Sequence, residues 1–235
     1  MQFKAPLLPG RLQRRYKRFL SDIELDSGET VKAHCPNPGS MLGLKQPGSR
    51  VWVSQSDNPK RKLKYTFELI HADDTMIGIN TGYPNGIVQE AVLDGTITEL
   101  AGYQTLKREV KYGRNSRIDM LLDDPAKGKC YVEVKNVHLR RRPDLMEFPD
   151  CVTSRGAKHL AELSDMVVAG HRAVMVFLIQ RDDGKAFSLA RDLDPAYGAA
   201  FDKAVAAGVE MLAYSCRISE TEIRAYRPVP ILDLT

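Results

Sequence analysis

The sequence has few cysteines, one tryptophan and no long hydrophobic run. The four cysteines are scattered and form no C-x-x-C pair, so we predict neither a zinc site nor a disulfide framework, but reduced thiols. The longest apolar run is the seven residues 173–179, too short to span a membrane. No apolar stretch follows the basic residues 11–18 as a signal peptide requires. We therefore expect a cytoplasmic protein with no membrane partner.

Several common enzyme motifs are also missing. The sequence contains no G-x-x-x-x-G-K-[ST] loop, no dinucleotide-binding fingerprint and no H-E-x-x-H helix. Nucleotide hydrolysis, dinucleotide-dependent redox chemistry and zinc proteolysis therefore have no support. The neighbours His34 and Cys35 do not suggest a nucleophile pair, because adjacent residues of a strand point to opposite faces.

Positive charge is unevenly distributed, although the net charge is only +4. Residues 1–20 contain six cations and no acid, and further clusters occupy residues 60–64 and 140–142. Any one cluster is compatible with a solvated loop, but three together favour a polyanionic partner. The expected nucleic-acid contacts are the cations of the first cluster and of a later helix: Arg11, Arg14, Arg15, Lys17, Arg18, Arg155 and Lys158.

An acidic motif carries the clearest chemical signal. Asp119 lies in a strand-like segment, and Glu133 follows fourteen positions later with Lys135 two residues beyond it. Because side chains alternate along a strand, Glu133 and Lys135 share one face. The turn-like residues 123–129 would pair the two strands as a hairpin. Two carboxylates and an ammonium on one face can hold a hard cation and stabilise charge on a phosphate.

Solvated antiparallel strands also carry alternating charges without any function, and on the motif alone this ordinary interpretation is favoured. The secondary-structure elements around the motif favour a nuclease-like site instead. Helix signals, three strands, a second helix and a buried strand follow in that order, which resembles the core of restriction-endonuclease-like folds. The expected bounds are a helix at 86–95 capped by Asn85, a strand at 103–111 with a turn at 112–115, the hairpin, a helix at 154–169 capped by Thr153, and a strand at 173–179.

The first eighty residues read as a small β-barrel. Five short strands are expected, which fits an OB-type barrel, although an SH3-like barrel is also compatible: 16–24, 30–34, 50–55, 64–71 and 75–80. Its aromatic residues are available for base stacking but are more often core: Tyr16, Phe19, Trp52, Tyr65 and Phe67. A cluster of turn residues at 81–86 places the domain boundary, giving domains 1–82 and 83–235. A helix at 194–206, a strand at 211–218 and an edge strand at 222–227 complete the second domain.

Five local strings occur in an order that resembles the sugar fermentation stimulation protein A (SfsA) family: residues 34–41, 80–82, 117–119, 132–136 and 148–160. The resemblance implies a mixed α/β protein with an N-terminal OB-like barrel and a C-terminal restriction-endonuclease-like domain. It further implies DNA binding and, in enteric bacteria, a link to expression of maltose-metabolism genes. Ile118 replaces the proline of the usual PD-(D/E)XK signature, a common substitution.

Motif and resemblance together predict a Mg²⁺ or Mn²⁺ ion between Asp119 and Glu133. Lys135 would orient the attacking water or stabilise phosphate charge, and Glu90 would be an outer carboxylate. His159 is interpreted either as a neighbour of the metal or as a simple polar contact. The alternatives are a DNA-binding regulator with a catalytically silent nuclease fold, and an RNA-processing enzyme; DNA is the favoured partner. The oligomeric state is left open.

Overall fold

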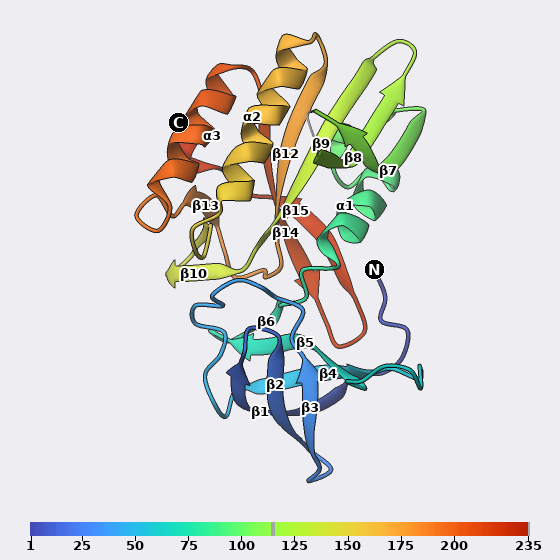
Figure 1. The fold of residues 1–235 in the computed structure, drawn as a ribbon, viewed down its shortest axis with the longest axis vertical. Coiled ribbons are helices and arrows are strands. Elements are labelled where there is room, and N and C mark those ends of the chain that lie inside the picture. The colour runs from blue at the N-terminus through green and yellow to red at the C-terminus, as the bar shows by residue number, and fades with distance from the viewer. Residues whose placement is uncertain (114–115, 235) are drawn as a thin grey trace.

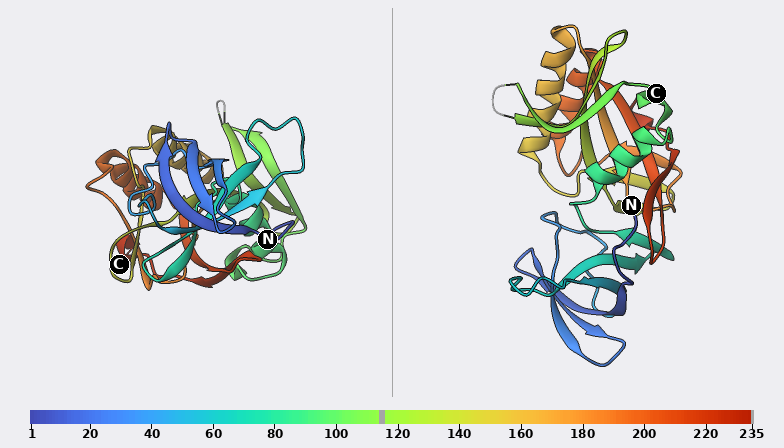
Figure 2. Two further views of the ribbon diagram at one scale, coloured as in Figure 1. Left: turned by 90° about the horizontal axis from the view of Figure 1, so that it is seen from below. Right: turned by 90° about the vertical axis from the view of Figure 1, so that its right-hand side faces the viewer.

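A computed structural model of the chain describes residues 1–113 and 116–234, and it has two lobes (Figure 1). Residues 114–115, which belong to the turn predicted at 112–115, lie outside the described residues. The first lobe is a β-barrel, and the second is a sheet with helices on both faces (Figures 1 and 2). In the described part of the chain, no helix is both long and apolar enough to cross a membrane.

The barrel is of the OB type. Its strands are ordered β3-β2-β1-β4-β5-β6, and a parallel pairing of β3 with β5 closes it. Alternate residues such as Leu12, Ile23 and Phe67 point inward and are fully buried, as the two-residue strand period requires. The strands are β1 (Leu8–Tyr16), β2 (Leu20–Leu25), β3 (Thr30–His34), β4 (Arg50–Gln55), β5 (Tyr65–Ala72) and β6 (Thr75–Gly78).

The strand predicted at 16–24 corresponds to β2, but its predicted start is wrong, and strand β1 was not predicted. The chain turns there at Lys17 and Arg18, whose φ angles are 49° and 62°, and β1 and β2 form a hairpin around this turn. The turn contains no glycine or proline, so the sequence carried no signal for it. The first basic cluster therefore lies along strand β1 and its turn rather than in a loose arm.

Some of the aromatic side chains considered for stacking are core residues. Trp52 and Phe67 are buried. Phe19 is 44% exposed and stacks on His34, with ring centroids 6.3 Å apart. Tyr16 is partly buried and bonds to Asp22. Tyr65 is also partly buried, so Phe19 is the most exposed of the five.

The second sheet has the order β15-β14-β12-β9-β8-β7. Its central strand β12 runs parallel to both neighbours, β9 and β14, and is covered on both faces, which explains its continuous apolar run. The predicted order of helix, three strands, helix and strand is confirmed. The bounds are β7 (Thr105–Tyr112), β8 (Ser116–Asp124), β9 (Gly128–Val137), β12 (Arg172–Ile179), β14 (Glu210–Ile218) and β15 (Ile223–Pro228).

The helices follow their capping signals with one exception. Helices α2 (Ser154–Val168) and α3 (Pro195–Ala206) are capped by the side chains of Thr153 and Asp194. Helix α1 (Pro84–Leu93) starts earlier than predicted: its N-cap is Tyr83, and Pro84 occupies the first turn. Asn85 is thus inside the helix, and its side chain is free for another role. Short 3-10 helices occupy Thr98–Leu100 and Leu232–Leu234.

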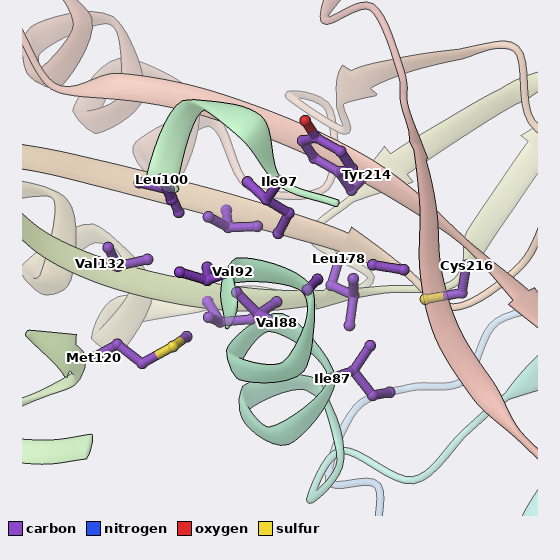
Figure 3. Packing of buried hydrophobic residues seen from close by; sticks show 14 of the residues in the cluster. Ile87, Val88, Val92, Ile97, Leu100, Met120, Val132, Leu178, Tyr214 and Cys216 are labelled. Carbon is purple, nitrogen blue, oxygen red and sulfur yellow. The ribbon is translucent and has the colours of Figure 1, made fainter. Parts of the chain in front are cut away.

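Helix α1 covers one face of the sheet and α2 and α3 cover the other (Figure 1). Ile87, Val88 and Val92 of α1 pack against a cluster that includes Val132 and Leu178 (Figure 3). Burial of these apolar groups stabilises the domain by roughly 25 cal/mol per Å² removed from water. Since Val132 and Val134 of β9 face α1, the intervening Glu133 faces α2.

A small sheet was not predicted. It consists of β10 (Leu139–Arg142), β11 (Leu145–Phe148) and β13 (Ala186–Leu189), in the order β10-β11-β13. The basic cluster 140–142 lies on β10, and Arg141 forms ion pairs with Glu147 and Asp192. This cluster is therefore largely engaged within the protein.

Candidate metal and phosphate site

The acidic residues lie where two strands separate. Strands β8 and β9 pair as the predicted antiparallel hairpin from Asp124 and Gly128 up to Met120 and Val132. Beyond this pair, the backbone N–H of Val134 donates to the side chain of Asp119 at 2.8 Å. The site therefore sits in a fork between the two motif strands.

Both oxygens of Asp119 are held by donors. Oδ2 accepts from the Val134 N–H, and Oδ1 accepts from the side-chain amide of Asn85 at 2.7 Å. Burial raises the pKa of Asp119, and the nearby Glu133 carboxylate raises it further. Asp119 is thus oriented by the protein and electrostatically coupled to Glu133.

Glu133 is 2% exposed and carries the site's most buried charge. Its Oε1 accepts from Lys135 Nζ at 2.6 Å and from the ring of His159. Burial opposes ionisation, but the bonds from His159 and Lys135 outweigh it and hold the pKa of Glu133 below its usual value. The second oxygen, Oε2, is buried and has no hydrogen-bond partner among the described residues.

The contacts of His159 define which nitrogen carries its proton. The Arg155 Nε–H donates to Nε2 of His159 at 3.2 Å, so Nε2 must accept. The ring proton then lies on Nδ1, which donates to Glu133 Oε1, so Lys135 Nζ, although 3.1 Å from the same Nδ1, donates to Glu133 Oε1 and not to the ring. His159 is therefore a link from Arg155 to Glu133, and of its two predicted interpretations the structure favours the neighbour of the site.

Helix α2 also brings Glu162 toward the site. Its Oε1 accepts from Ser116 Oγ at 2.8 Å and lies 3.6 Å from Lys158 Nζ, while its buried Oε2 has no partner in the described part of the chain. The buried Tyr112 hydroxyl likewise has no hydrogen-bond partner among the described residues. Burial and then the charges of Glu133, Glu162 and Asp119 raise the Tyr112 pKa far above its usual value, which places that hydroxyl among the three carboxylates.

This donor set suits a hard divalent cation. Such ions prefer carboxylate oxygens and keep several waters, so two protein carboxylates suffice. The unpartnered Glu133 Oε2 offers one oxygen, and Asp119 lies across the fork. In residues 1–113 and 116–234, no group of three histidine, cysteine or acidic side chains is drawn together closely enough to enclose a metal ion.

The other expected site residues lie in different surroundings. The Glu90 carboxylate is 58% exposed and pairs with the Met1 amine, so the structure does not bring it to Asp119 and Glu133. Arg15 donates to the carbonyls of Asn37 and Gly39 and supports the barrel. Arg11 donates to Gly48 O, and Arg14 pairs with Asp22.

The remaining predicted cations are better placed for a ligand. Lys17 and Arg18 are exposed at the barrel turn. Arg155 and Lys158 are exposed on α2, where they adjoin His159 and Glu162. Of these four cations, Arg155 and Lys158 lie beside the site, and Arg18 lies at the pocket between the lobes.

Sequence reasoning missed the roles of Asn85 and Glu162 and left that of His159 undecided. Asn85 gave a stronger signal as a helix cap than as a partner of Asp119. His159 and Glu162 flank Leu160 and Leu163 on α2, and this adjacency to the buried stripe was the available clue to their burial. It does not specify which strand they face.

Comparison with known proteins identifies the chain. Residues 82–222 match the family described as "Sugar fermentation stimulation protein RE domain", and residues 14–79 match the "SfsA N-terminal OB domain". The sugar fermentation stimulation protein homologs of Brucella ovis and Brucella melitensis are each 58% identical over 234 residues, covering 100% of this chain and 98% of theirs.

A solved structure agrees. Pyrococcus furiosus SfsA in complex with Ca²⁺ matches with a TM-score of 0.88 at 25% identity, over 98% of this chain and 97% of that one. The OB-type barrel and the nuclease-like core expected from the sequence are both confirmed. The chain is a member of the SfsA family.

Proposed function

We propose that this protein is a DNA-binding nuclease that depends on a divalent cation, Mg²⁺ or Mn²⁺. The observation that carries the proposal is the buried carboxylate of Glu133, bonded to Lys135 and His159 on one oxygen and without a partner on the other. Leaving a buried ionised oxygen unpaired costs on the order of 1–3 kcal/mol, which a bound cation would offset. The archaeal relative was solved in complex with Ca²⁺, which supports a divalent cation as the cofactor of this protein.

The position of each residue in the site suggests its role in the proposed reaction. Asp119 and Glu133 would hold the cation, whose positive charge stabilises negative charge on a phosphate when it is bound. Lys135 Nζ lies within 2.6 Å of Glu133 and can turn toward a phosphate oxygen or orient the attacking water. Asn85 and His159 fix the two carboxylates. Glu162, rather than Glu90, is the better candidate for an outer carboxylate, because it is buried beside Tyr112.

Nucleic-acid binding would rest on exposed cations of both domains. Lys17 and Arg18 from the barrel and Arg155 and Lys158 from α2 are available to contact phosphates. Such contacts are independent of base sequence and weaken as salt rises. DNA is the proposed partner, and RNA is tested beside it.

The test compares wild type with Glu133→Gln and Lys135→Ala on single-stranded DNA, duplex DNA and RNA, each with Mg²⁺, Mn²⁺ or EDTA. Both substitutions should abolish cleavage and leave DNA affinity within roughly tenfold, or ~1.4 kcal/mol, because these groups act mainly in the transition state. Lys129→Ala, on the exposed start of the same strand, is the matched control.

The outcomes separate the functions. No cleavage of any substrate by wild type would favour a DNA-binding regulator built on a silent nuclease fold. Cleavage of RNA alone would favour an RNA-processing enzyme. Equal cleavage by wild type and Glu133→Gln would identify a contaminating nuclease and leave the proposal unsupported.

A further inference from the structure

A pocket of about 340 Å³ lies between the two lobes, away from the fork itself. Arg18 lines it from the barrel, and His138, Asp150 and Thr153 line it from the second lobe. Its volume is in the range of small-ligand sites. A larger cavity of about 630 Å³ is lined by Pro36 and Asn80, the neighbours of residues 37 and 81 in the smaller pocket, so these two chain segments border both cavities.

The walls of the smaller pocket are fixed by hydrogen bonds between the lobes. Ser40 Oγ donates to Asp150 O at 2.7 Å, and the Met41 N–H donates to Asp150 Oδ2 at 2.9 Å. Arg15 holds the barrel side through the carbonyls of Asn37 and Gly39, at 2.9 and 3.0 Å. The pocket is therefore formed before any ligand arrives, which lowers the entropy cost of binding.

His138 supplies an unused donor. Gln180 donates to Asn136 Oδ1 at 2.6 Å, which fixes the Asn136 amide so that its nitrogen donates to His138 Nδ1 at 3.1 Å. The His138 proton must then lie on Nε2. This Nε2–H belongs to a side chain that is 6% exposed, and it has no hydrogen-bond partner among the described residues. Asp150 Oδ2 is 3.6 Å away, beyond hydrogen-bond distance.

The pocket is lined by charged side chains of both signs, Asp150 and Arg18. Asp150 stays ionised: burial opposes this, but the positive end of the His138 Nε2–H dipole, 3.6 Å from Oδ2, and the hydrogen bond from the Met41 N–H outweigh it and hold the pKa of Asp150 well below its usual range. Asp150 repels a phosphate, whereas the exposed Arg18 attracts one. The donor of His138 suits an uncharged acceptor such as a base carbonyl. Pro149 and the exposed Val152 provide apolar surface for the base.

The pocket is continuous with the fork along the chain. Residues 151–153, which line it, run directly into α2. Arg155 and His159 follow on that helix, and His159 contacts Glu133. We propose that the pocket holds one unpaired nucleotide of a DNA strand whose neighbouring phosphate lies at Glu133, with the nucleotide's own phosphate at Arg18 and its base against His138. The placement of the neighbouring phosphate at Glu133 rests on the proposed nuclease site, whereas the binding of the nucleotide in the pocket does not.

The test measures affinity for fluorescein-labelled single-stranded and duplex DNA of one sequence, in EDTA, so that no cleavage is needed. Arg18→Ala should weaken single-strand binding about tenfold, as the loss of one charge-assisted hydrogen bond does, and should affect duplex binding far less. His138→Phe, which keeps a ring but removes the donor, should act in the same direction, and His138→Gln should restore part of the affinity. Lys203→Ala is the control, since Lys203 is an exposed cation of α3 and is not among the residues that line the pocket.

The possible outcomes test the nucleotide pocket and the nuclease function separately. Equal losses on both DNA forms, or equal affinity for a free deoxynucleoside monophosphate and for the strand, would overturn the inference. So would unchanged single-strand binding by Arg18→Ala and His138→Phe; if wild type still cleaves in a Glu133-dependent manner, the proposed function survives that failure. Selective loss of single-strand binding with no cleavage by wild type would support the pocket and overturn the nuclease.

Discussion

The side-chain amide of Asn85 donates a 2.7 Å hydrogen bond to Asp119 Oδ1 and joins the first turn of α1 to the strand fork. The Val134 N–H holds the other oxygen of the same carboxylate. Asp119 is therefore oriented by two elements that pack on each other through the apolar cluster beneath α1. A cation that enters the fork would meet a carboxylate already in place, which avoids the cost of ordering it.

Asn85→Ala should weaken Mn²⁺ binding about 10–100-fold, the usual effect of losing a partner that orients a metal ligand. Isothermal titration calorimetry measures this directly. Gln89→Ala, one turn further along α1, is the control, because Gln89 contacts only Arg108 among its described side-chain hydrogen bonds. An unchanged dissociation constant in Asn85→Ala would show that Asp119 does not need this bond.

Asp119→Ala should remove high-affinity Mn²⁺ binding, because a single remaining carboxylate and neutral groups hold a hard cation poorly. Asp123→Asn on the same strand should bind as wild type does, since Asp123 lies at the hairpin end of β8, beside Lys129. Calorimetry at equal protein concentrations compares the two. Similar affinities in both variants would remove Asp119 from the site.

His159→Phe should lower Mn²⁺ affinity about 10–100-fold, whereas His159→Asn should retain most of it. The reason is positional: the asparagine amide nitrogen can replace Nδ1, which donates to Glu133, and phenylalanine cannot. Near-ultraviolet circular dichroism of the metal-free proteins checks that both are folded. If asparagine is as damaging as phenylalanine, His159 acts through volume and not through its donor.

Arg15→Ala should lower the free energy of unfolding by about 1–3 kcal/mol, because two carbonyls in a half-buried loop lose their donor. Arg14→Ala should have little effect on stability, since its ion pair with Asp22 is exposed. Urea titration followed by tryptophan fluorescence gives both values. The opposite ranking would show that Arg15 is not a structural clamp.

Asp150→Asn should destabilise the protein at neutral pH by about 1–3 kcal/mol. The folded-state pKa of Asp150 lies below that of the unfolded chain, so its contribution is complete above about pH 5 and declines as pH falls below about 4 toward the folded-state value. Urea titrations from pH 7 to pH 3 should therefore show the gap between wild type and variant closing. Asp57→Asn in an exposed loop is the control, and a gap that does not depend on pH would contradict the assignment.

Much of this fold was predictable from local signals. The cap at Thr153 and the unbroken apolar run of β12 predicted helix α2 and the central strand, because each signal is strong and local. The turn at Lys17 and Arg18 was not predictable, since neither residue type favours positive φ. The small sheet β10-β11-β13 was not predicted because its strands have only four residues each, and β13 pairs with β11 across about forty intervening residues. The proposed division at residue 82 stays a prediction.

The sequence motif of the site was predictable, but the hydrogen bonds that surround the motif were not. Strand alternation placed Glu133 and Lys135 on one face, and the structure joins them at 2.6 Å. Asn85, His159 and Glu162 meet the motif only after α1 and α2 pack on opposite faces of the sheet. Their distances to Asp119 and Glu133 depend on helix placement, which no local spacing encodes.

The first few residues lie against the second lobe although they precede the barrel. Phe3 N donates to Thr221 O, and Ile223 N donates to Met1 O, so the chain leaves the second lobe before β1 and returns to it after β6 (Figure 2). The barrel is thus connected to the second lobe by two chain segments, one before β1 and one after β6. Two connections restrict rotation of one lobe against the other to the axis that passes through both, whereas a single connection would allow rotation in any direction. Any such movement would have to break the hydrogen bonds between the lobes, among them those from Met41 to Asp150 and from Arg181 to Asp73.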